Sequence, residues 1–214
     1  MTGLFGGSFD PVHLGHVATA EALRDTLGLR EIRFLPAARS PLKAAATADV
    51  HRVAMLERAL AGHPGLVLDC SELEHPAPSY TIDTLRRLRA ALGPAEPLVF
   101  ILGLDSFLEL PRWKDWQALT DVAHLLVVNR PGSHPRFVAA LAEWLDSRLA
   151  PDIATLRTSP AGRVLLVDTP PRDIASRTIR AAVRAGRDTA GWLNPAVRDY
   201  IDLHHLYCGE ADPQ

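Results

Sequence analysis

Two histidines three residues apart follow a glycine-rich turn near the start of the chain. His13 and His16 belong to residues 6–16, which read GGSFDPVHLGH and come directly after the apolar residues 2–5. Helical spacing after Pro11 puts both imidazoles in the first turn of a helix, on one face. The unpaired N–H groups and the positive dipole end of a helix start favour an anion, and two imidazole donors strengthen that preference. The pattern therefore predicts a phosphate site.

The elements that must position these histidines follow from the residue types. Residues 2–5 are predicted to form a buried strand, and Gly6 and Gly7 to adopt turn dihedrals that other residues resist. Pro11 delays the helix until the turn has closed. The helix is expected to start near Val12 or His13, with apolar residues at helical spacing, and to stop at Gly28. A nucleotide can then approach the backbone at the glycines.

Two simpler explanations of this stretch compete with a phosphate site. A pair of histidines on one helix face also occurs in zinc sites, but zinc requires three or four ligands, and Cys70 and Cys208 stand alone. A glycine pair by itself marks no more than a turn, and the chain lacks the GxGxxG and GxxxxGK[ST] patterns. No metal site built from protein ligands is predicted.

Strand candidates alternate with amphipathic helices along the rest of the chain. The predicted strands cover residues 2–5, 31–35, 66–68, 98–102, 125–128 and 163–167. The predicted helices after the first cover residues 48–61, 81–92, 106–110, 137–149, 176–186 and 195–203. This alternation predicts an α/β fold with a parallel sheet, which binds ligands at the carboxyl ends of its strands.

Composition limits the class of protein and its partners. With 214 residues, of which 47% are hydrophobic and 22% charged, the chain is expected to form a single domain, residues 1–214, with a frayed tail after about Tyr207. The net charge of −2 argues against nucleic acid as a partner. Short apolar runs and the lack of a secretory segment argue against a membrane, and two isolated cysteines fit the cytoplasm. A homo-oligomer remains compatible with the sequence.

A second group of donors stands in residues 174–180, which read IASRTIR and open a predicted helix. Ser176 and Arg180 are candidate phosphate donors there, although Ser176 is also a common helix cap and Arg180 a common surface residue. No serine lies in a GxSxG turn, and neither cysteine has a histidine neighbour. If a substrate phosphate attacks, its second pKa of about 6 already makes it mostly anionic. Positioning and charge neutralisation would then carry catalysis, with Mg²⁺ held mainly by phosphates and water.

Several motifs together resemble one family. Residues 6–16 are similar to the GGTFDPxHxGH signature of the nucleotidyltransferases related to class I aminoacyl-tRNA synthetases, and residues 174–180 to their ISSTxIR motif. Residues 78–84 (PSYTIDT), 103–106 (GLDS), 111–114 (PRWK) and 130–132 (RPG) resemble segments of bacterial nicotinate mononucleotide adenylyltransferases, in the same order and spacing. The resemblance runs from Leu4 to about Tyr207. It implies a Rossmann-like, doubly wound parallel sheet of about five or six strands.

The same resemblance implies an activity and a set of site residues. The enzyme would transfer AMP from ATP to nicotinate mononucleotide, forming deamido-NAD and pyrophosphate in NAD biosynthesis, with Mg²⁺ as cofactor. Its catalytic residues would be His13, His16, Lys43 and Arg180. ATP would contact Gly6, Gly7, Ser8, Phe9, His16, Gly103, Asp105, Ser176, Ile179 and Arg180. Nicotinate mononucleotide would contact Ser8, Lys43, Tyr80, Thr81, Trp113, Lys114 and Arg130.

The acceptor preference depends on these implied contacts. Trp113 can stack on the pyridine ring, and backbone N–H groups at Thr81 and Lys114 can receive a carboxylate, so the acid is expected over the amide. The chain departs from the family at Leu42, Ala175 and Arg177, where a histidine, a serine and a threonine are usual. Three alternatives stay open: transfer to nicotinamide mononucleotide, transfer to phosphopantetheine, and a nucleotide sensor without catalysis.

Overall fold

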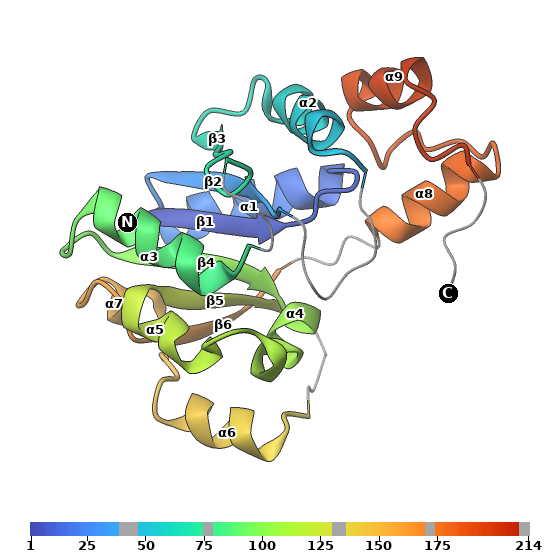
Figure 1. Cartoon of the computed structure of the whole chain (residues 1–214). Coiled ribbons are helices and arrows are strands. Elements are labelled where there is room, and N and C mark those ends of the chain that lie inside the picture. Colours follow the sequence, from blue (N-terminus) through green and yellow to red (C-terminus); the bar gives the residue numbers. More distant parts are fainter. Residues whose placement is uncertain (39–46, 75–78, 130–135, 170–173, 210–214) are drawn as a thin grey trace.

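The central sheet of the molecule is built from parallel strands only. The computed structural model describes residues 1–38, 47–74, 79–129, 136–169 and 174–209 (Figure 1). Within these residues six strands form one sheet in the order β3-β2-β1-β4-β5-β6. Their bounds are β1 Thr2–Gly7, β2 Glu31–Pro36, β3 Leu66–Leu68, β4 Leu98–Gly103, β5 His124–Asn129 and β6 Val164–Asp168. This confirms the predicted doubly wound α/β fold.

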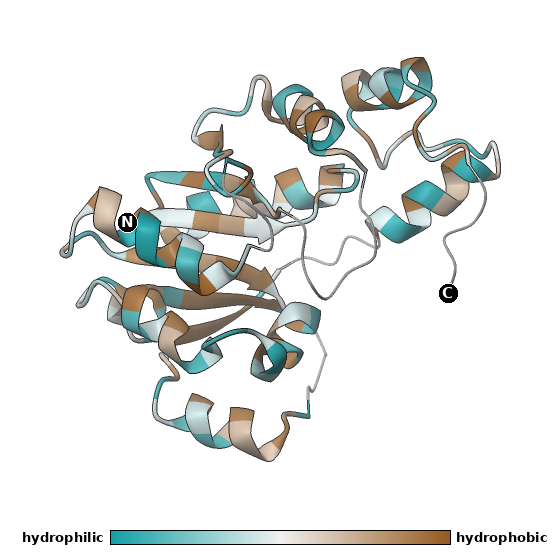
Figure 2. Cartoon of the chain, in the orientation of Figure 1, coloured by the Kyte–Doolittle hydropathy of each residue, from teal (hydrophilic) through white to brown (hydrophobic). Residues whose placement is uncertain are grey.

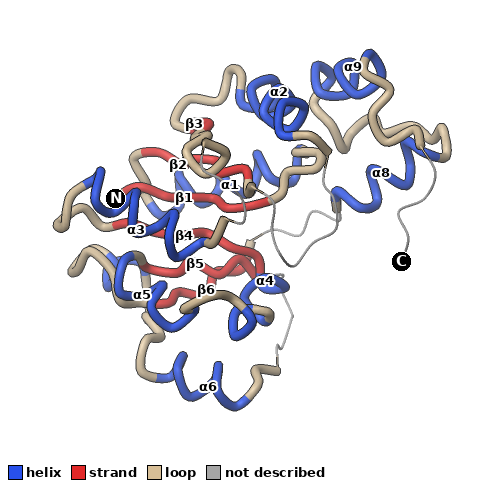
Figure 3. The backbone as a smooth tube through the Cα atoms, in the orientation of Figure 1, coloured by secondary structure: helices blue, strands red, loops and turns tan. Residues whose placement is uncertain are grey.

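Helices cover both faces of this sheet (Figure 3). One core contains side chains of α1, α2, α7, α8 and α9, and a second core on the other face contains those of α3, α4, α5 and α6. The bounds are α1 Leu14–Leu27, α2 Asp49–Leu60, α3 Thr81–Leu92, α4 Leu104–Leu108, α5 Leu119–Val122, α6 Ala139–Asp146, α7 Ile153–Leu156, α8 Ser176–Arg184 and α9 Pro195–Leu203. Short 3-10 turns occupy Leu110–Arg112 and Trp116–Ala118. None of these described helices is long and apolar enough to cross a membrane.

Successive side chains of the central strands belong alternately to the two cores. Leu4 of β1 belongs to the core under α3, whereas Phe5 belongs to the core under α1, and Phe100 and Ile101 of β4 divide in the same way. Successive side chains of a strand point to opposite faces, so a sheet covered on both sides needs apolar residues at every position. Figure 2 shows β4, β5 and β6 as largely hydrophobic, β1 and β2 as less uniform, and the helices as mixed. The nearly unbroken apolar runs of the sequence have this cause.

Element ends differ from the expected ones for local reasons. Strand β1 continues through Gly7, two residues beyond the predicted end. Helix α4 begins at Leu104, two residues earlier than expected. Gly103, in an extended conformation, is the residue before this helix. Helix α6 is confined to Ala139–Asp146, shorter at both ends than residues 137–149, with Val138 extended before it. The four-residue helices α5 and α7 are too short to leave a periodic pattern.

The crevice expected of such a sheet lies between β1 and β4. These strands are hydrogen-bonded neighbours, with Phe5 beside Ile101. The helix after β1 packs on one face of the sheet and the helix after β4 packs on the other, so the chain diverges at their carboxyl ends. Open α/β sheets bind ligands at this point. The glycine-rich turn after β1 is therefore at the position where a ligand is expected.

Candidate active site

The turn that follows β1, residues 8–13, will be called the histidine turn. Its left-handed residue is Phe9, with φ of 48°, and Gly6 and Gly7 instead end β1 without positive φ. The expectation that these glycines supply special dihedrals is therefore wrong. A Cβ at Gly6 would lie 2.7 Å from the Phe100 ring, and one at Gly7 would lie 3.0 Å from the Phe9 ring. Both glycines are needed because aromatic rings lie against the backbone.

His13 and His16 cap the start of α1 by binding one another's backbone. His13 is the residue before the helix, and its Nδ1 accepts from the His16 N–H at 3.3 Å. In return, the His16 Nδ1 accepts from the His13 N–H at 3.2 Å, and the two rings stack with centroids 3.6 Å apart. A Cβ at Gly15 would lie 3.0 Å from the His13 ring, which explains the glycine between the histidines. His13 thus precedes the first turn in which the sequence placed it.

This mutual capping determines where each imidazole carries its proton. A nitrogen that accepts a hydrogen bond has no proton, so each neutral ring is protonated at Nε2. Burial lowers the pKa of His13 to about 4. Burial, and then the charge of His13, lower the pKa of His16 well below its usual value. Both rings are therefore uncharged near pH 7, and each offers one Nε2–H donor.

Side chains from distant segments bind the carbonyl groups of the histidine turn. Arg52 donates from Nη1 to the Ser8 carbonyl at 2.8 Å. Arg180 donates from Nη1 to the Asp10 carbonyl at 2.7 Å, and Ser176 donates from Oγ to the Pro11 carbonyl at 2.9 Å. Ser176 and Arg180 thus lie at the histidine turn, as their predicted role requires, but their first partners are backbone oxygens.

Two other predicted ATP contacts serve packing in this structure. The Ile179 side chain is fully buried, in the same core cluster as Phe9, so its side chain is not available to ATP. Phe9 is only 2% exposed, and its ring lies edge-on to His16 with centroids 5.1 Å apart. Gly103 is exposed and precedes α4. Lys43 and Arg130 lie outside the described residues, as does Leu42.

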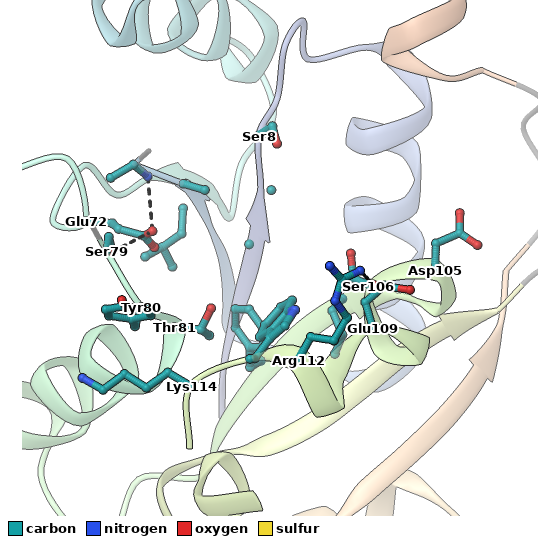
Figure 4. A pocket seen from close by; sticks show the side chains of 18 residues that line it. Ser8, Glu72, Ser79, Tyr80, Thr81, Asp105, Ser106, Glu109, Arg112 and Lys114 are labelled. Atoms are coloured by element: carbon teal, nitrogen blue, oxygen red, sulfur yellow. Dashed lines mark hydrogen bonds and ion pairs between the residues drawn. The ribbon is translucent and has the colours of Figure 1, made fainter. Parts of the chain in front are cut away.

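A pocket of about 390 Å³ adjoins the glycine end of β1 (Figure 4). Eight predicted site residues line it, namely Gly6, Gly7, Ser8, Tyr80, Thr81, Asp105, Trp113 and Lys114. In Figure 4, Tyr80, Thr81 and Lys114 lie on one side and Ser106 and Arg112 on the other, with Asp105 at the rim. Segments predicted to hold the nucleotide and the acceptor therefore share one cavity.

The start of α3 forms the wall of the pocket at which the sequence predicted contacts with nicotinate mononucleotide. No side chain caps this helix at Tyr80, the residue before it. The Lys114 Nζ donates to the Asp83 Oδ2 at 2.9 Å and lies 4.7 Å from the centre of the Tyr80 ring. The hydrogen bond to Asp83 raises the pKa of Lys114. The charge of Lys114 is thus balanced by Asp83, and the helix start contributes its N–H groups.

Glu72 is a pocket residue that the sequence reasoning missed. Its Oε1 accepts from the Ala38 N–H at 3.2 Å and from the Ser79 hydroxyl at 2.9 Å, as the dashed lines of Figure 4 show. Burial raises the pKa of this carboxyl, although the two hydrogen bonds oppose the change. Glu72 joins two walls of the pocket. As one acid in a polar segment, it left no signal in the sequence.

Arg52 was also missed, and here a signal exists. It is 2% exposed in α2 and occupies the same helix face as Met55, Leu56 and Ala59. An arginine on the apolar face of an amphipathic helix requires partners, because a buried charge without them is costly. Its Nη2 donates to Asp49 at 2.5 Å. Arg52 therefore ties α2 to the histidine turn through Ser8.

Among the described residues, no group of three or more His, Cys, Asp or Glu side chains is arranged to hold a metal ion. Ala175, where the family usually has a serine, precedes α8 and forms no side-chain cap there. Neither Cys70 nor Cys208 forms a disulfide.

The chain is similar to known proteins over nearly its full length. Residues 4–182 match the model of a family described as cytidylyltransferase-like. A protein of Laribacter hongkongensis named "Probable nicotinate-nucleotide adenylyltransferase" is 49% identical, over 98% of this chain and 95% of that protein. A protein of the same name from Stenotrophomonas maltophilia is 45% identical, over 95% of both chains. Nicotinic acid mononucleotide adenylyltransferase from Plasmodium falciparum, solved in complex with NaAD, superimposes with a TM-score of 0.73 at 19% identity, over 96% of each chain.

Proposed function

Because the chain belongs to the family of nicotinate-nucleotide adenylyltransferases, we propose that it transfers AMP from ATP to nicotinate mononucleotide, giving deamido-NAD and pyrophosphate. The observation that carries this proposal is the pocket lined jointly by the glycine end of β1, the start of α3 and Trp113. It joins a place for a nucleotide to a place for an aromatic acid. Both substrates must lie side by side for the reaction to occur.

The transfer itself needs alignment and charge stabilisation. A phosphate oxygen of the acceptor attacks the α-phosphorus of ATP, the bond to the bridging oxygen breaks, and pyrophosphate leaves with those electrons. No proton has to be removed from the attacking phosphate, because it is already mostly anionic. The Nε2–H groups of His13 and His16 stabilise the charge that develops on the phosphates, together with the N-terminus of α1. Neutral, fixed donors suit this task since they need no reorganisation.

ATP is assigned to the side of the pocket formed by β1 and β4. Gly6, Gly7 and Ser8 would lie beside the adenosine together with Phe9, Gly103 and Asp105. The triphosphate would extend toward the histidine turn, where Arg180 and Ser176 are tied. Arg180 uses Nη1 for the Asp10 carbonyl, and its guanidinium has further N–H groups for phosphate oxygens. Lys43 and Ile179 complete this assignment, Ile179 through its backbone alone.

The acceptor is assigned to the side formed by α3 and Trp113. Trp113 and Tyr80 supply aromatic surface for the pyridine ring, with Ser8, Lys43 and Arg130 as further contacts. The carboxylate of nicotinate would bind backbone N–H groups at Thr81 and Lys114. An uncapped helix start favours an anion, whereas an amide presents a donor to the same N–H groups. This contrast supports a preference for the acid.

Three further assignments accompany the reaction. Mg²⁺ would enter on the phosphates of ATP, where it would neutralise their charge. The whole chain would act as one nucleotidyltransferase domain on small molecules, with no nucleic acid or membrane partner. The two unpaired cysteines support an enzyme of the reducing cytoplasm.

Pyrophosphate release tests the proposal directly. The purified protein is incubated with ATP and Mg²⁺, and nicotinate mononucleotide, nicotinamide mononucleotide or phosphopantetheine is supplied separately. We expect rapid release with the nicotinate acceptor, and little without an acceptor. Preference for another acceptor would retain the transfer chemistry and overturn the assignments of Thr81, Trp113 and Lys114. ATP binding without release with any acceptor would favour a nucleotide sensor.

A further inference from the structure

Asp10, at the centre of the histidine turn, connects three segments that are far apart in the sequence. Asp10 is 8% exposed, and its Oδ1 accepts from the hydroxyl of Tyr207 at 2.7 Å. Oδ2 accepts from the backbone N–H of Thr47 at 3.2 Å. A buried carboxylate depends on such donors, because water does not replace them. The position of Asp10 therefore depends on Tyr207.

Tyr207 is itself held in place. Its hydroxyl lies 4.0 Å from the Met55 sulfur, and burial followed by the charge of Asp10 raises its pKa, so the hydroxyl keeps its proton. Its backbone is left-handed, with φ of 64°, which a residue other than glycine adopts only where its surroundings enforce it. On one side Leu206 donates to the Ile201 carbonyl, and on the other Arg184 donates to the Gly209 carbonyl at 3.1 Å. Tyr207 is thus a fixed donor.

The hydrogen bond from Tyr207 and the donors from α8 both bind the histidine turn. Arg180 holds the carbonyl of Asp10 while Tyr207 holds its carboxylate, so this residue is fixed at both ends. Three residues later the chain reaches His13, whose ring is oriented by its bonds to His16. Figure 1 shows α8 on the side of the molecule toward which β1 points, and α9, which leads to Tyr207, next to α2.

We propose that Tyr207 is a positioning residue for the transfer reaction, holding the Asp10 carboxylate so that the histidine turn presents His13 and His16 to the phosphates. This inference rests on the proposed function. Tyr207 is not among the residues that line the pocket. Its loss should lower the rate of the chemical step and leave the binding of the acceptor almost unchanged, because the acceptor is assigned to α3.

The test compares two tyrosines that each lose only a hydroxyl. Tyr207→Phe removes the hydrogen bond to Asp10. Tyr200→Phe removes a 3.0 Å hydrogen bond between the Tyr200 hydroxyl and the His51 Nδ1, and neither of these residues belongs to the histidine turn. For Tyr207→Phe we expect kcat to fall about tenfold, the scale of one buried hydrogen bond, with KM for the acceptor within twofold. For Tyr200→Phe we expect kcat within twofold. Equal loss in both variants, or none in Tyr207→Phe, would overturn the inference.

Two further measurements separate this inference from the proposed function. In an Asp10→Ala background the acceptor of the Tyr207 hydroxyl is gone, so Tyr207→Phe should then lower kcat less than threefold, whereas full additivity contradicts the coupling. Amide hydrogen exchange over residues 8–16 needs no substrate. Faster exchange in Tyr207→Phe than in Tyr200→Phe is expected even if the acceptor assignment is wrong, and identical exchange would overturn the inference even if transfer is observed.

Discussion

Two helix starts line the site, and they are built in opposite ways. The start of α1 is buried and capped by side chains, with His13 7% exposed and its ring bonded to the His16 backbone. The start of α3 has no side-chain cap, and the Lys114–Asp83 pair beside it is 43% and 37% exposed. One helix start is fixed by many internal bonds, whereas the other is left open to solvent and ligand.

This difference separates the two tasks of a transferase. Catalytic donors gain most from a fixed geometry, because no reorganisation is then needed as charge develops. Recognition of a flat aromatic acid needs a surface and accessible N–H groups, which an open helix start offers. We therefore expect substitutions at the start of α1 to change mainly kcat and the pH dependence of stability. Substitutions around α3 should change mainly KM.

The largest effect is expected for His16. His16→Ala removes the Nε2–H donor, and the loss of one such donor typically lowers the rate about 10²- to 10³-fold. Steady-state kcat with ATP and nicotinate mononucleotide measures this. Alanine also removes half of the mutual cap, so His16→Gln is the matched variant: glutamine at this helix position can still accept from the His13 N–H. His16→Gln should keep the melting temperature, and it should lose less activity than His16→Ala because its side-chain amide also carries N–H donors. Near-normal kcat in a folded His16→Ala protein would contradict the role of the Nε2–H donor.

The second effect is a loss of stability in acid through His13. Its pKa is lowered to about 4 from an ordinary value of 6.5, so the unfolded chain binds a proton between these pH values that the folded chain does not. The free energy of unfolding therefore falls as pH drops from 6.5 to 4, by about 3 kcal/mol in total. Urea unfolding at several pH values measures it.

Asparagine provides the control for His13. The amide side chain of the His13→Asn variant still caps the helix but does not titrate, so the difference in unfolding free energy between wild type and variant should change with pH across this window. A constant difference would show that His13 is protonated alike in the folded and unfolded chains.

A smaller effect is expected on the open side, at Trp113. Trp113→Ala should raise KM for nicotinate mononucleotide about threefold to tenfold, the scale of one aromatic stacking contact, with kcat within twofold. Trp116→Ala is the matched control, because Trp116 packs on Trp144 with ring centroids 5.1 Å apart and does not line the pocket. A fall in kcat without a change in KM would assign Trp113 to the reaction.

The smallest effect is expected for Lys114. Its ion pair with Asp83 is exposed, and such pairs contribute little to stability. Lys114→Gln should therefore change the melting temperature slightly and KM for the acceptor less than threefold, since the backbone N–H remains. An increase in KM of more than tenfold would indicate that the ammonium group binds the carboxylate directly.

The sequence predicted the sheet, its helices and the pocket-lining motifs for a clear reason. The strands are buried on both faces and leave apolar runs. Gly6 and Gly7 marked the site correctly but for a different reason, since the close approach of Phe100 and Phe9 requires them and special dihedrals do not. Burial on both faces of the sheet and close backbone packing restrict the residue type at each position, so they can be read from the sequence. The bounds of α1 were nearly right because helical spacing and Gly28 define them.

What the sequence did not reveal depends on long-range contacts. The mutual capping of His13 and His16 requires a particular rotamer of each ring, which spacing alone does not specify. Ser176 and Arg180 were recognised as donors, but not that backbone carbonyls are their partners. Glu72 and Tyr207 each act through residues distant along the chain. Only the buried Arg52 left a readable sign, a charge on an apolar helix face.

The histidine turn and its partners are also separated in the order of synthesis. Ser176, Arg180 and Tyr207 follow their turn partners by 165, 170 and 197 residues. A ribosome that has released the turn and the first strands has not yet made the donors that bind it. During translation the histidine turn therefore lacks these donors until the chain is nearly complete. Because α8 and α9 also supply side chains to one core, chains cut short by a few dozen residues at the end should lose stability as well as activity.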